Sequence, residues 1–200
     1  MKFIGITGGV GAGKSEILSY LARKPHTRVM LADEIAHELM EPGADCFEEI
    51  CNTFFGEDIF SPEGGFDRKK LASVIFADER KREQMNAIVH PAVKRYVINT
   101  AEAERKRGEL QLLVLEAALL IEDHYDEICD ELWYIYTKEE IRKARLMASR
   151  GYTAGKVQQI FASQLKESVY REHCAVVIDN NGTVEETLQQ LAGVLEHMKL

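Results

Sequence analysis

The sequence predicts an α/β fold in which a parallel, doubly wound sheet is flanked by helices. Five short apolar segments of strand length recur along the 200 residues, and segments with helical spacing separate them. Strands that alternate with helices are typical of parallel sheets, because a crossover between parallel strands needs a connection of helix length. The predicted strands are residues 3–6, 28–31, 110–115, 132–137 and 175–178.

Composition limits the domain count and the partners. An apolar content of 46% over 200 residues can bury one substantial core, so one main domain is expected. A net charge of −8 disfavours general binding to nucleic acid or to a membrane surface. The four cysteines show no C-x-x-C spacing, no signal peptide leads the chain, and no apolar run approaches the ~20 residues of a spanning helix. We therefore expect a soluble, cytoplasmic protein with free thiols and without a membrane or nucleic-acid partner.

A glycine-rich segment follows the first predicted strand. Residues 8–15 read GGVGAGKS and fit the spacing G-x-x-x-x-G-K-[ST]. Backbone N–H groups of such a loop surround phosphate oxygens, Lys14 supplies a cation to the β- and γ-phosphates, and Ser15 offers its hydroxyl to Mg²⁺. Residues 16–21 have helical spacing, so the loop meets a helix N-terminus, which favours anions. The predicted ATP-binding residues of this phosphate-binding loop (P-loop) are Gly8, Gly9, Gly11, Ala12, Gly13, Lys14, Ser15 and Glu16.

Asp33 follows the second predicted strand, residues 28–31. Ligands bind outside the carboxyl ends of parallel strands, so a carboxylate at this position can face the transferred phosphate. Asp33 also precedes residues 34–39, which have helical character, and Asp is a preferred N-cap residue. The catalytic role and the capping role both remain open, and they do not exclude each other.

Residues 40–107 are predicted to form a helical insertion between the second and third strands. Helical spacing is found over residues 45–55, from residue 66 through Ile75, and from Glu79 to Lys106. Pro91 predicts a kink or a fresh start in the last of these helices, because proline costs about 3 kcal/mol inside a helix. Such an insertion is a natural place for a second substrate.

Two further features concern the core of the fold. Glu116 follows the third predicted strand, where a carboxylate beside a P-loop commonly ligates Mg²⁺ directly or through water. The metal-binding candidates are therefore Ser15 and Glu116, and Mg²⁺ is the predicted cofactor. The last helix is expected over residues 183–198, with a capping box formed by Thr183 and Glu186.

Residues 138–166 form a basic segment in a chain that is acidic as a whole. They carry seven basic residues against two acidic ones, a local net charge of +5. Phosphoryl transfer depends on neutralising charge around the γ-phosphoryl group, so a basic helical lid over the P-loop has a clear use. The alternative is a solvated basic face, which describes most runs of charge. Helices are predicted over residues 139–149 and 154–167.

The ordered set of motifs resembles that of the dephospho-coenzyme A kinase family over nearly the whole chain. An N-K-x-D motif for guanine recognition is absent from the sequence, and the size suits a small-metabolite kinase. The matching motifs are residues 6–15, Ala32-Asp33 with Ile35-Ala36, Glu41-Pro42-Gly43, Asp67-Arg68 with Leu71 and Ile75-Phe76, Asn86 with His90-Pro91, residues 119–122, Gln164 and residues 177–182. The resemblance implies transfer of phosphate from ATP to the ribose 3′-hydroxyl of dephospho-CoA, which yields CoA and ADP.

The same resemblance assigns the catalytic residues and shows where this chain departs from the family. It implies that Asp33 is the base and that Lys14 and a lid arginine provide positive charge. The usual position of that arginine holds Ser149, so either Arg150 or Arg145 supplies the charge; we choose Arg150 as catalytic and Arg145 as ATP-binding. Other departures are Leu31, Glu16 and Ala118, which replace an Asp, a Ser or Thr, and a Pro.

The matching motifs also suggest how the acceptor is held. Arg68, His90 and Arg95 are the acceptor-binding candidates beside Asp33. A His before a proline is often a structural hydrogen-bonding residue, and Arg68 could equally pair with Asp67 or a neighbouring helix. These alternatives remain open.

The sequence thus predicts a single P-loop kinase domain over residues 1–200. Its core comprises residues 1–39, 108–137 and 168–200, with an acceptor-binding insertion at 40–107 and a lid at 138–167. The expected partners are ATP and dephospho-CoA, and the expected state is a monomer or a weak homo-oligomer. The competing functions are a nucleoside or nucleotide kinase and a non-catalytic ATP-binding protein.

Overall fold

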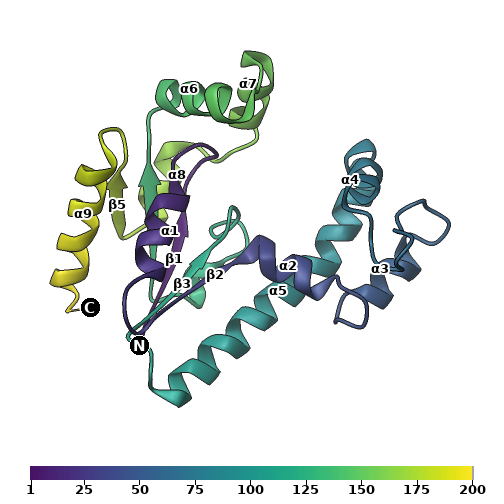
Figure 1. Ribbon diagram of the computed structural model, residues 1–200, viewed down its shortest axis with the longest axis horizontal. Coiled ribbons are helices and arrows are strands. Elements are labelled where there is room, and N and C mark those ends of the chain that lie inside the picture. The colour runs from purple at the N-terminus through teal and green to yellow at the C-terminus, as the bar shows by residue number, and fades with distance from the viewer. Residues whose placement is uncertain (200) are drawn as a thin grey trace. The chain divides into compact units, whose positions relative to one another are not determined.

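The computed structural model describes residues 1–199, and within them five strands form one sheet (Figure 1). The strand order is β2-β3-β1-β4-β5, and the pairs β1–β3, β1–β4 and β4–β5 are parallel. The strands are β1 (Lys2–Thr7), β2 (Thr27–Leu31), β3 (Leu112–Glu116), β4 (Glu131–Tyr136) and β5 (Val176–Asp179). All five strands coincide with predicted ones to within a few residues, so the predicted α/β fold is confirmed.

Helices connect these strands. In chain order they are α1 (Lys14–Ala22), α2 (Ala32–Leu39), α3 (Phe47–Thr53), α4 (Arg68–Ala77), α5 (Glu79–Arg107), α6 (Glu139–Arg150), α7 (Ala154–Ala162), α8 (Glu167–His173) and α9 (Val184–His197). A short 3₁₀ helix, η1, spans Tyr125–Glu127. The predicted capping box at the start of α9 is present, since the side chains of Thr183 and Glu186 each accept the other's backbone N–H.

The chain forms two compact units, and each is described by itself. The first comprises Met1–Met30 and the chain from Glu104 onward, and contains nearly all of the sheet with α1 and α6 to α9. The second comprises Leu31–Ala103, and contains α2, α3, α4 and most of α5. Neither unit, nor any other part of residues 1–199, has a helix with the length and apolar character needed to cross a membrane.

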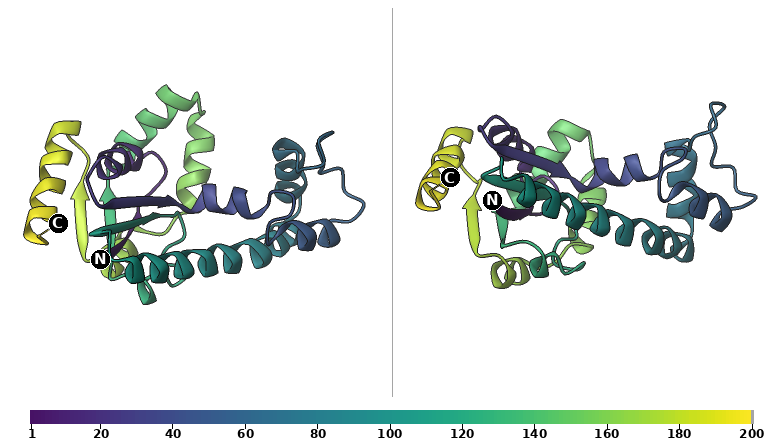
Figure 2. Two further views of the ribbon diagram at one scale, coloured as in Figure 1. Left: turned by 60° about the horizontal axis from the view of Figure 1, so that its bottom comes forward. Right: turned by 90° about the horizontal axis from the view of Figure 1, so that it is seen from below.

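The core of the first unit is built on strands that are covered on both faces. Residues 112–115 of β3 are fully buried, as expected for the apolar run that predicted this strand. Helices α1 and α9 pack against each other on one side of the sheet, whereas α8 packs on β4 on the other side (Figure 2). The Tyr134 ring of β4 stacks on Tyr170 of α8 with centroids 4.7 Å apart. The loops at the carboxyl ends of the strands therefore extend from a sheet that is packed on both faces.

The second unit has a smaller core of its own. Ile50, Phe54, Ile59 and Leu71 are buried there. Asp67 is the N-cap of α4 and accepts the backbone N–H groups of Lys69 and Lys70. The hydrogen bond from the Lys70 N–H is the largest influence on the pKa of Asp67 and, with that from Lys69, holds it below its usual range.

Two helix boundaries differ from the prediction. Helix α5 runs for 29 residues through Pro91 without ending, so a fresh start at this proline is wrong. The proline removes one backbone donor, while the buried Val89, Ala92 and Val93 around it hold the helix in place. Helix α7 ends at Ala162 rather than continuing to residue 167, and a separate helix, α8, begins at Glu167. The C-cap residue Ser163 ends α7, and its hydroxyl donates back to the carbonyl of Ile160.

Candidate active site

The P-loop joins β1 to α1, and glycine is required at two of its positions by the packing around them. Gly13 is the N-cap of α1 with φ of 85°, and a Cβ there would also collide with the side-chain amide of Asn180. At Gly8, φ is 150° and a Cβ would lie 2.6 Å from the backbone carbonyl oxygen of Ile135, whereas at Gly9 the nearest atoms belong to the guanidinium of Arg142. Helix α1 begins at Lys14, so its first backbone N–H groups belong to the loop that the sequence assigned to phosphate.

Lys14 lies folded back across its own loop. Its ammonium donates to the carbonyl oxygen of Gly8 at 2.7 Å and lies 3.4 Å from a carboxylate oxygen of Glu116. Glu116 is the last residue of β3 and is in register with Ile6 of β1, which explains why it lies next to the loop. The structure therefore brings together two of the predicted site residues, a cation and a carboxylate, at adjacent strand ends.

The possible magnesium ligands are few. No cluster of three or more His, Cys, Asp or Glu side chains able to hold a metal occurs within residues 1–199. Mg²⁺ in phosphotransferases keeps several waters and binds phosphate oxygens, and so needs only one or two protein ligands. The Ser15 hydroxyl, exposed in the first turn of α1, and the Glu116 carboxylate beside Lys14 meet this requirement. Glu16 is exposed in the same turn of the helix.

The carbonyl oxygen of Ala12 is a junction that fixes the second half of the loop. It accepts from the Asn180 side chain at 2.7 Å and from Arg145 at 3.4 Å, and the Thr137 hydroxyl lies 3.0 Å away. Asn180 is held in turn by Thr187, whose hydroxyl donates to the Asn180 Oδ1 atom at 2.8 Å. The sequence patterns predict no role for Asn180 or Thr137, although residues 177–182 match a motif of the family.

The three arginines of α6 have different surroundings. Arg145 donates to the Asn180 carbonyl at 3.0 Å as well as to Ala12, so it lies against the P-loop, and its role in binding ATP stays a prediction. Arg150, the last residue of α6, is exposed, and its side chain makes no hydrogen bond or ion pair within residues 1–199. Arg142 is buried, and its Nε atom donates to the Val10 carbonyl at 3.0 Å. Sequence reasoning counted Arg142 among the basic residues but did not place it at the P-loop.

Asp33 is the second residue of α2. The N-cap of this helix is Leu31, which makes no side-chain capping hydrogen bond, so the prediction that Asp33 could be the cap is wrong. The helix begins at Ala32, two residues earlier than its apolar pattern suggested, because β2 passes into α2 directly. The Asp33 carboxylate is exposed and has no hydrogen-bond or ion-pair partner in the described part of the chain. Its proposed role as a base stays a prediction.

The remaining acceptor candidates lie in the second unit. Arg68 is the first residue of α4; its side chain is exposed and, among residues 1–199, does not pair with Asp67 or with any other carboxylate. Arg95 is exposed on α5, with its guanidinium 3.9 Å from the Asp45 carboxylate. His90 is half-buried on α5 and has an interaction partner. Arg68 and Arg95 lie on different helices, and no hydrogen bond or ion pair within residues 1–199 joins them.

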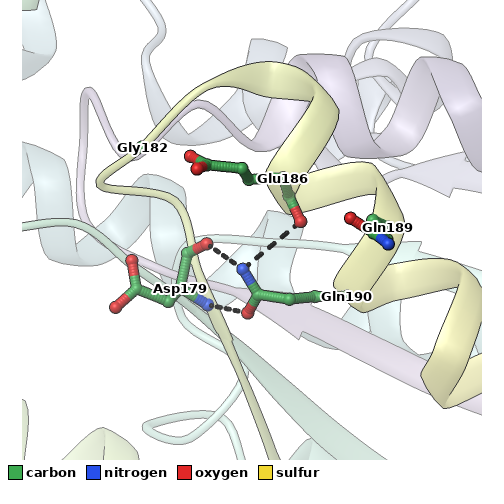
Figure 3. A pocket seen from close by; sticks show the side chains of 5 residues that line it. All are labelled: Asp179, Gly182, Glu186, Gln189 and Gln190. Carbon is green, nitrogen blue, oxygen red and sulfur yellow. Dashed lines mark hydrogen bonds between the residues drawn. The ribbon is translucent and has the colours of Figure 1, made fainter.

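A cavity of about 450 Å³ lies beside the end of β5 (Figure 3). The Gln190 side chain donates to the Asp179 carbonyl at 3.0 Å and accepts the Asp179 N–H at 3.1 Å, so it closes the edge of the sheet at this point. The carboxylates of Asp179 and Glu186 line the cavity. Two negative charges make this cavity unsuitable for phosphate.

The fold and the site together define the class of P-loop kinases. A loop with phosphate-binding spacing joins the central strand of a parallel sheet to a helix, and a basic helix lies against it. The family model described as Dephospho-CoA kinase matches residues 2–186. The chain belongs to the dephospho-CoA kinase family.

Individual relatives agree with this assignment. A dephospho-CoA kinase of Geobacter sulfurreducens is 39% identical over 186 residues, which cover 93% of each chain. One from Shouchella clausii is 37% identical over 192 residues, which cover 96% of each chain. Among solved structures, the crystal structure of TT1252 from Thermus thermophilus matches with a TM-score of 0.76 at 28% identity, covering 98% of this chain and 97% of that one.

Proposed function

We propose that this chain transfers the γ-phosphate of ATP to the ribose 3′-hydroxyl of dephospho-CoA and so forms CoA and ADP, the last step of coenzyme A biosynthesis. Membership of the family supports the choice of substrates. The observation that carries the chemistry is the placement of Lys14, whose ammonium is fixed between the Gly8 carbonyl and Glu116 at the start of α1.

The P-loop residues Gly8 to Glu16 would hold the phosphates of ATP. Phosphoryl transfer depends mainly on positioning and on neutralising charge, because the protein forms no bond to the transferred group. Lys14 would neutralise the β- and γ-phosphates, and Arg145, fixed by Ala12 and Asn180, would add charge from the side of α6. Bound Mg²⁺ would supply further charge neutralisation; Ser15 and Glu116 are its candidate ligands.

Asp33 is our candidate base. The ribose 3′-oxygen attacks the γ-phosphorus, the bond from that phosphorus to the ADP oxygen breaks, and the hydroxyl proton passes to the carboxylate. An exposed carboxylate two residues after β2, with no capping bond to give up, is suited to accept it. Arg150 at the exposed end of α6 would provide charge to the transferred group, while Arg68, His90 and Arg95 would hold the acceptor.

The division of labour along the chain follows the same proposal. The core of one kinase domain would comprise residues 1–39, 108–137 and 168–200, the acceptor-binding insertion residues 40–107, and the lid residues 138–167. We further propose that the protein acts in the cytoplasm, as a monomer or a weak homo-oligomer, without a membrane or nucleic-acid partner. The net charge of −8 supports the absence of these two partners.

A panel of acceptors tests the proposal. The chain is incubated with Mg²⁺-ATP and, in separate reactions, dephospho-CoA, adenosine, AMP and uridine, and ADP release is followed by a coupled assay. We expect ADP release in the reaction with dephospho-CoA and not in those with adenosine, AMP or uridine. Transfer to a nucleoside or to AMP would instead assign a nucleoside or nucleotide kinase. Binding of ATP without transfer to any acceptor would contradict catalysis altogether.

A further inference from the structure

Arg142 differs from the other basic residues of the predicted lid segment because it is buried. Only 8% of this residue is exposed, although the other basic residues of α6, Lys143, Arg145 and Arg150, are exposed or half-exposed. Burial is the largest influence on its pKa and lowers it. A buried arginine without a carboxylate in contact is costly, so its surroundings must hold it by other means.

Three groups from three parts of the first unit hold the guanidinium. Its Nε atom donates to the Val10 carbonyl in the P-loop at 3.0 Å. An Nη atom donates to the side-chain oxygen of Gln164, in the connection between α7 and α8. Its Cζ atom lies 4.2 Å from the centre of the Phe161 ring on α7, which is a cation–π distance. No carboxylate forms an ion pair with it within residues 1–199.

Arg142 contacts the first half of the P-loop, which Arg145 does not contact. Arg145 and Asn180 fix the loop at Ala12, whereas Arg142 lies against Gly9 and Val10. Gly9 is next to Gly8, whose carbonyl holds the Lys14 ammonium. Movement of the segment from Gly9 to Val10 would therefore displace the Lys14 ammonium, which is proposed to act on the phosphates.

We propose that Arg142 is a positioning residue for phosphoryl transfer, because it locks the Gly9–Val10 half of the P-loop to Gln164 and Phe161 of the lid. The inference rests on the proposed function, because it assumes that the P-loop binds ATP. Arg142 does not contact the phosphates in this proposal; it fixes the position of the P-loop relative to α7. A displacement of about 1 Å at such a site can cost on the order of 100-fold in rate.

A double-mutant cycle between Arg142 and Gln164 tests the proposal. We expect Arg142→Met to lower kcat by about 10–100-fold, while the Kd of ATP stays within about threefold, since the backbone groups of α1 still bind phosphate. Gln164→Leu should lower kcat by a smaller factor. The double variant should be no slower than Arg142→Met, because Gln164 acts through the guanidinium. Each kcat is expressed per ATP-binding site, which removes any unfolded fraction.

Two further variants separate positioning from packing. Gln164→Glu keeps an acceptor for the guanidinium and should retain at least half of the activity. Arg142→Lys should not rescue, because an ammonium cannot serve Val10 and Gln164 together and stack on Phe161. Arg23→Met, the same substitution at an exposed residue at the end of α1, is the matched control and should keep kcat within about twofold.

Amide hydrogen exchange gives a readout that needs no acceptor. In Arg142→Met, exchange should become faster at Val10 and over residues 154–164, and in Arg23→Met it should not. If the unaltered protein makes no CoA, the proposed function fails and hydrogen exchange alone tests the inference. Faster exchange in Arg142→Met then supports it, and unchanged exchange overturns it.

If the protein makes CoA, two results overturn the role of Arg142. One is that the effects of Arg142→Met and Gln164→Leu on kcat multiply in the double variant; the other is that Arg142→Met lowers Tm but leaves kcat per site unchanged.

Discussion

The side-chain amide of Asn180 donates to the carbonyl oxygen of Ala12 at 2.7 Å, and this bond joins two loops 168 residues apart in the chain. One loop begins α1 and the other follows β5. The P-loop is therefore not a free turn, since the last strand of the sheet fixes its second half.

Replacing Asn180 by alanine should therefore loosen the P-loop and destabilise the fold. The Thr187 hydroxyl would lose its acceptor on Asn180, and the Ala12 carbonyl would lose its shortest hydrogen bond. Loss of partners for buried polar groups costs about 1–3 kcal/mol, which urea unfolding can measure, and ATP affinity should fall with it. Gln189→Ala, at an exposed position of α9, is the control. Equal free energies of unfolding for Asn180→Ala and this control would contradict the role of the bond.

The removal of the Asp33 carboxylate tests the proposed base. Asp33→Asn should lower kcat by about 10²–10⁴-fold, the usual worth of a positioned general base. Its Tm should match that of Glu34→Gln, because both carboxylates lie in the first turn of α2 and neither caps it. Glu34→Gln should keep near-normal kcat. Near-normal turnover in Asp33→Asn, measured by CoA formation, would exclude this residue as the base.

The strands and the P-loop could be predicted from the sequence, but the contacts that surround the loop could not. An apolar run such as residues 112–115 and the spacing of Gly8, Gly13, Lys14 and Ser15 are local patterns. The bond between Asn180 and Ala12, and the burial of Arg142 against Val10, depend on which distant segments the fold brings together.

Local reasoning was also wrong where several local preferences competed. Asp is a preferred cap, yet Leu31 is the N-cap of α2 because β2 passes into the helix without a turn. Proline disfavours a helix interior, yet α5 continues through Pro91 because buried neighbours outweigh one lost hydrogen bond. Capping and proline preferences amount to about 1–3 kcal/mol, which tertiary packing can exceed.

Removal of divalent metal tests the assignment of Ser15 and Glu116. A chelator should abolish transfer, and added Mg²⁺ should restore it. Glu116→Gln should raise the Mg²⁺ concentration needed for half-maximal rate by about tenfold or more, the usual effect of altering groups at a metal site. A rate that does not respond to chelation would contradict the metal, whereas an unchanged Mg²⁺ requirement in Glu116→Gln would contradict the carboxylate alone.

The buried thiols predict how stability depends on pH. Burial raises the pKa of Cys174 to about 12, and it is also the main reason that the pKa of Cys129 is raised to about 12. A thiol in the unfolded chain ionises near pH 8.5. Because the folded pKa is the higher one, the stabilisation is complete below about pH 8.5 and is lost as pH rises towards 12. Urea unfolding at pH 7.5, 9 and 10.5 should show this decline, with a smaller slope in Cys174→Ala. Equal slopes in the two proteins would show that this thiol does not titrate on unfolding.

The position of the transferred phosphate tests the central claim most directly. The protein is incubated with dephospho-CoA and ATP labelled in the γ-phosphate, and the product is separated and treated with a 3′-nucleotidase. We predict a labelled product that co-migrates with CoA and loses its label to this enzyme. Label on another hydroxyl, or ADP release without labelled product, would contradict transfer to the ribose 3′-hydroxyl.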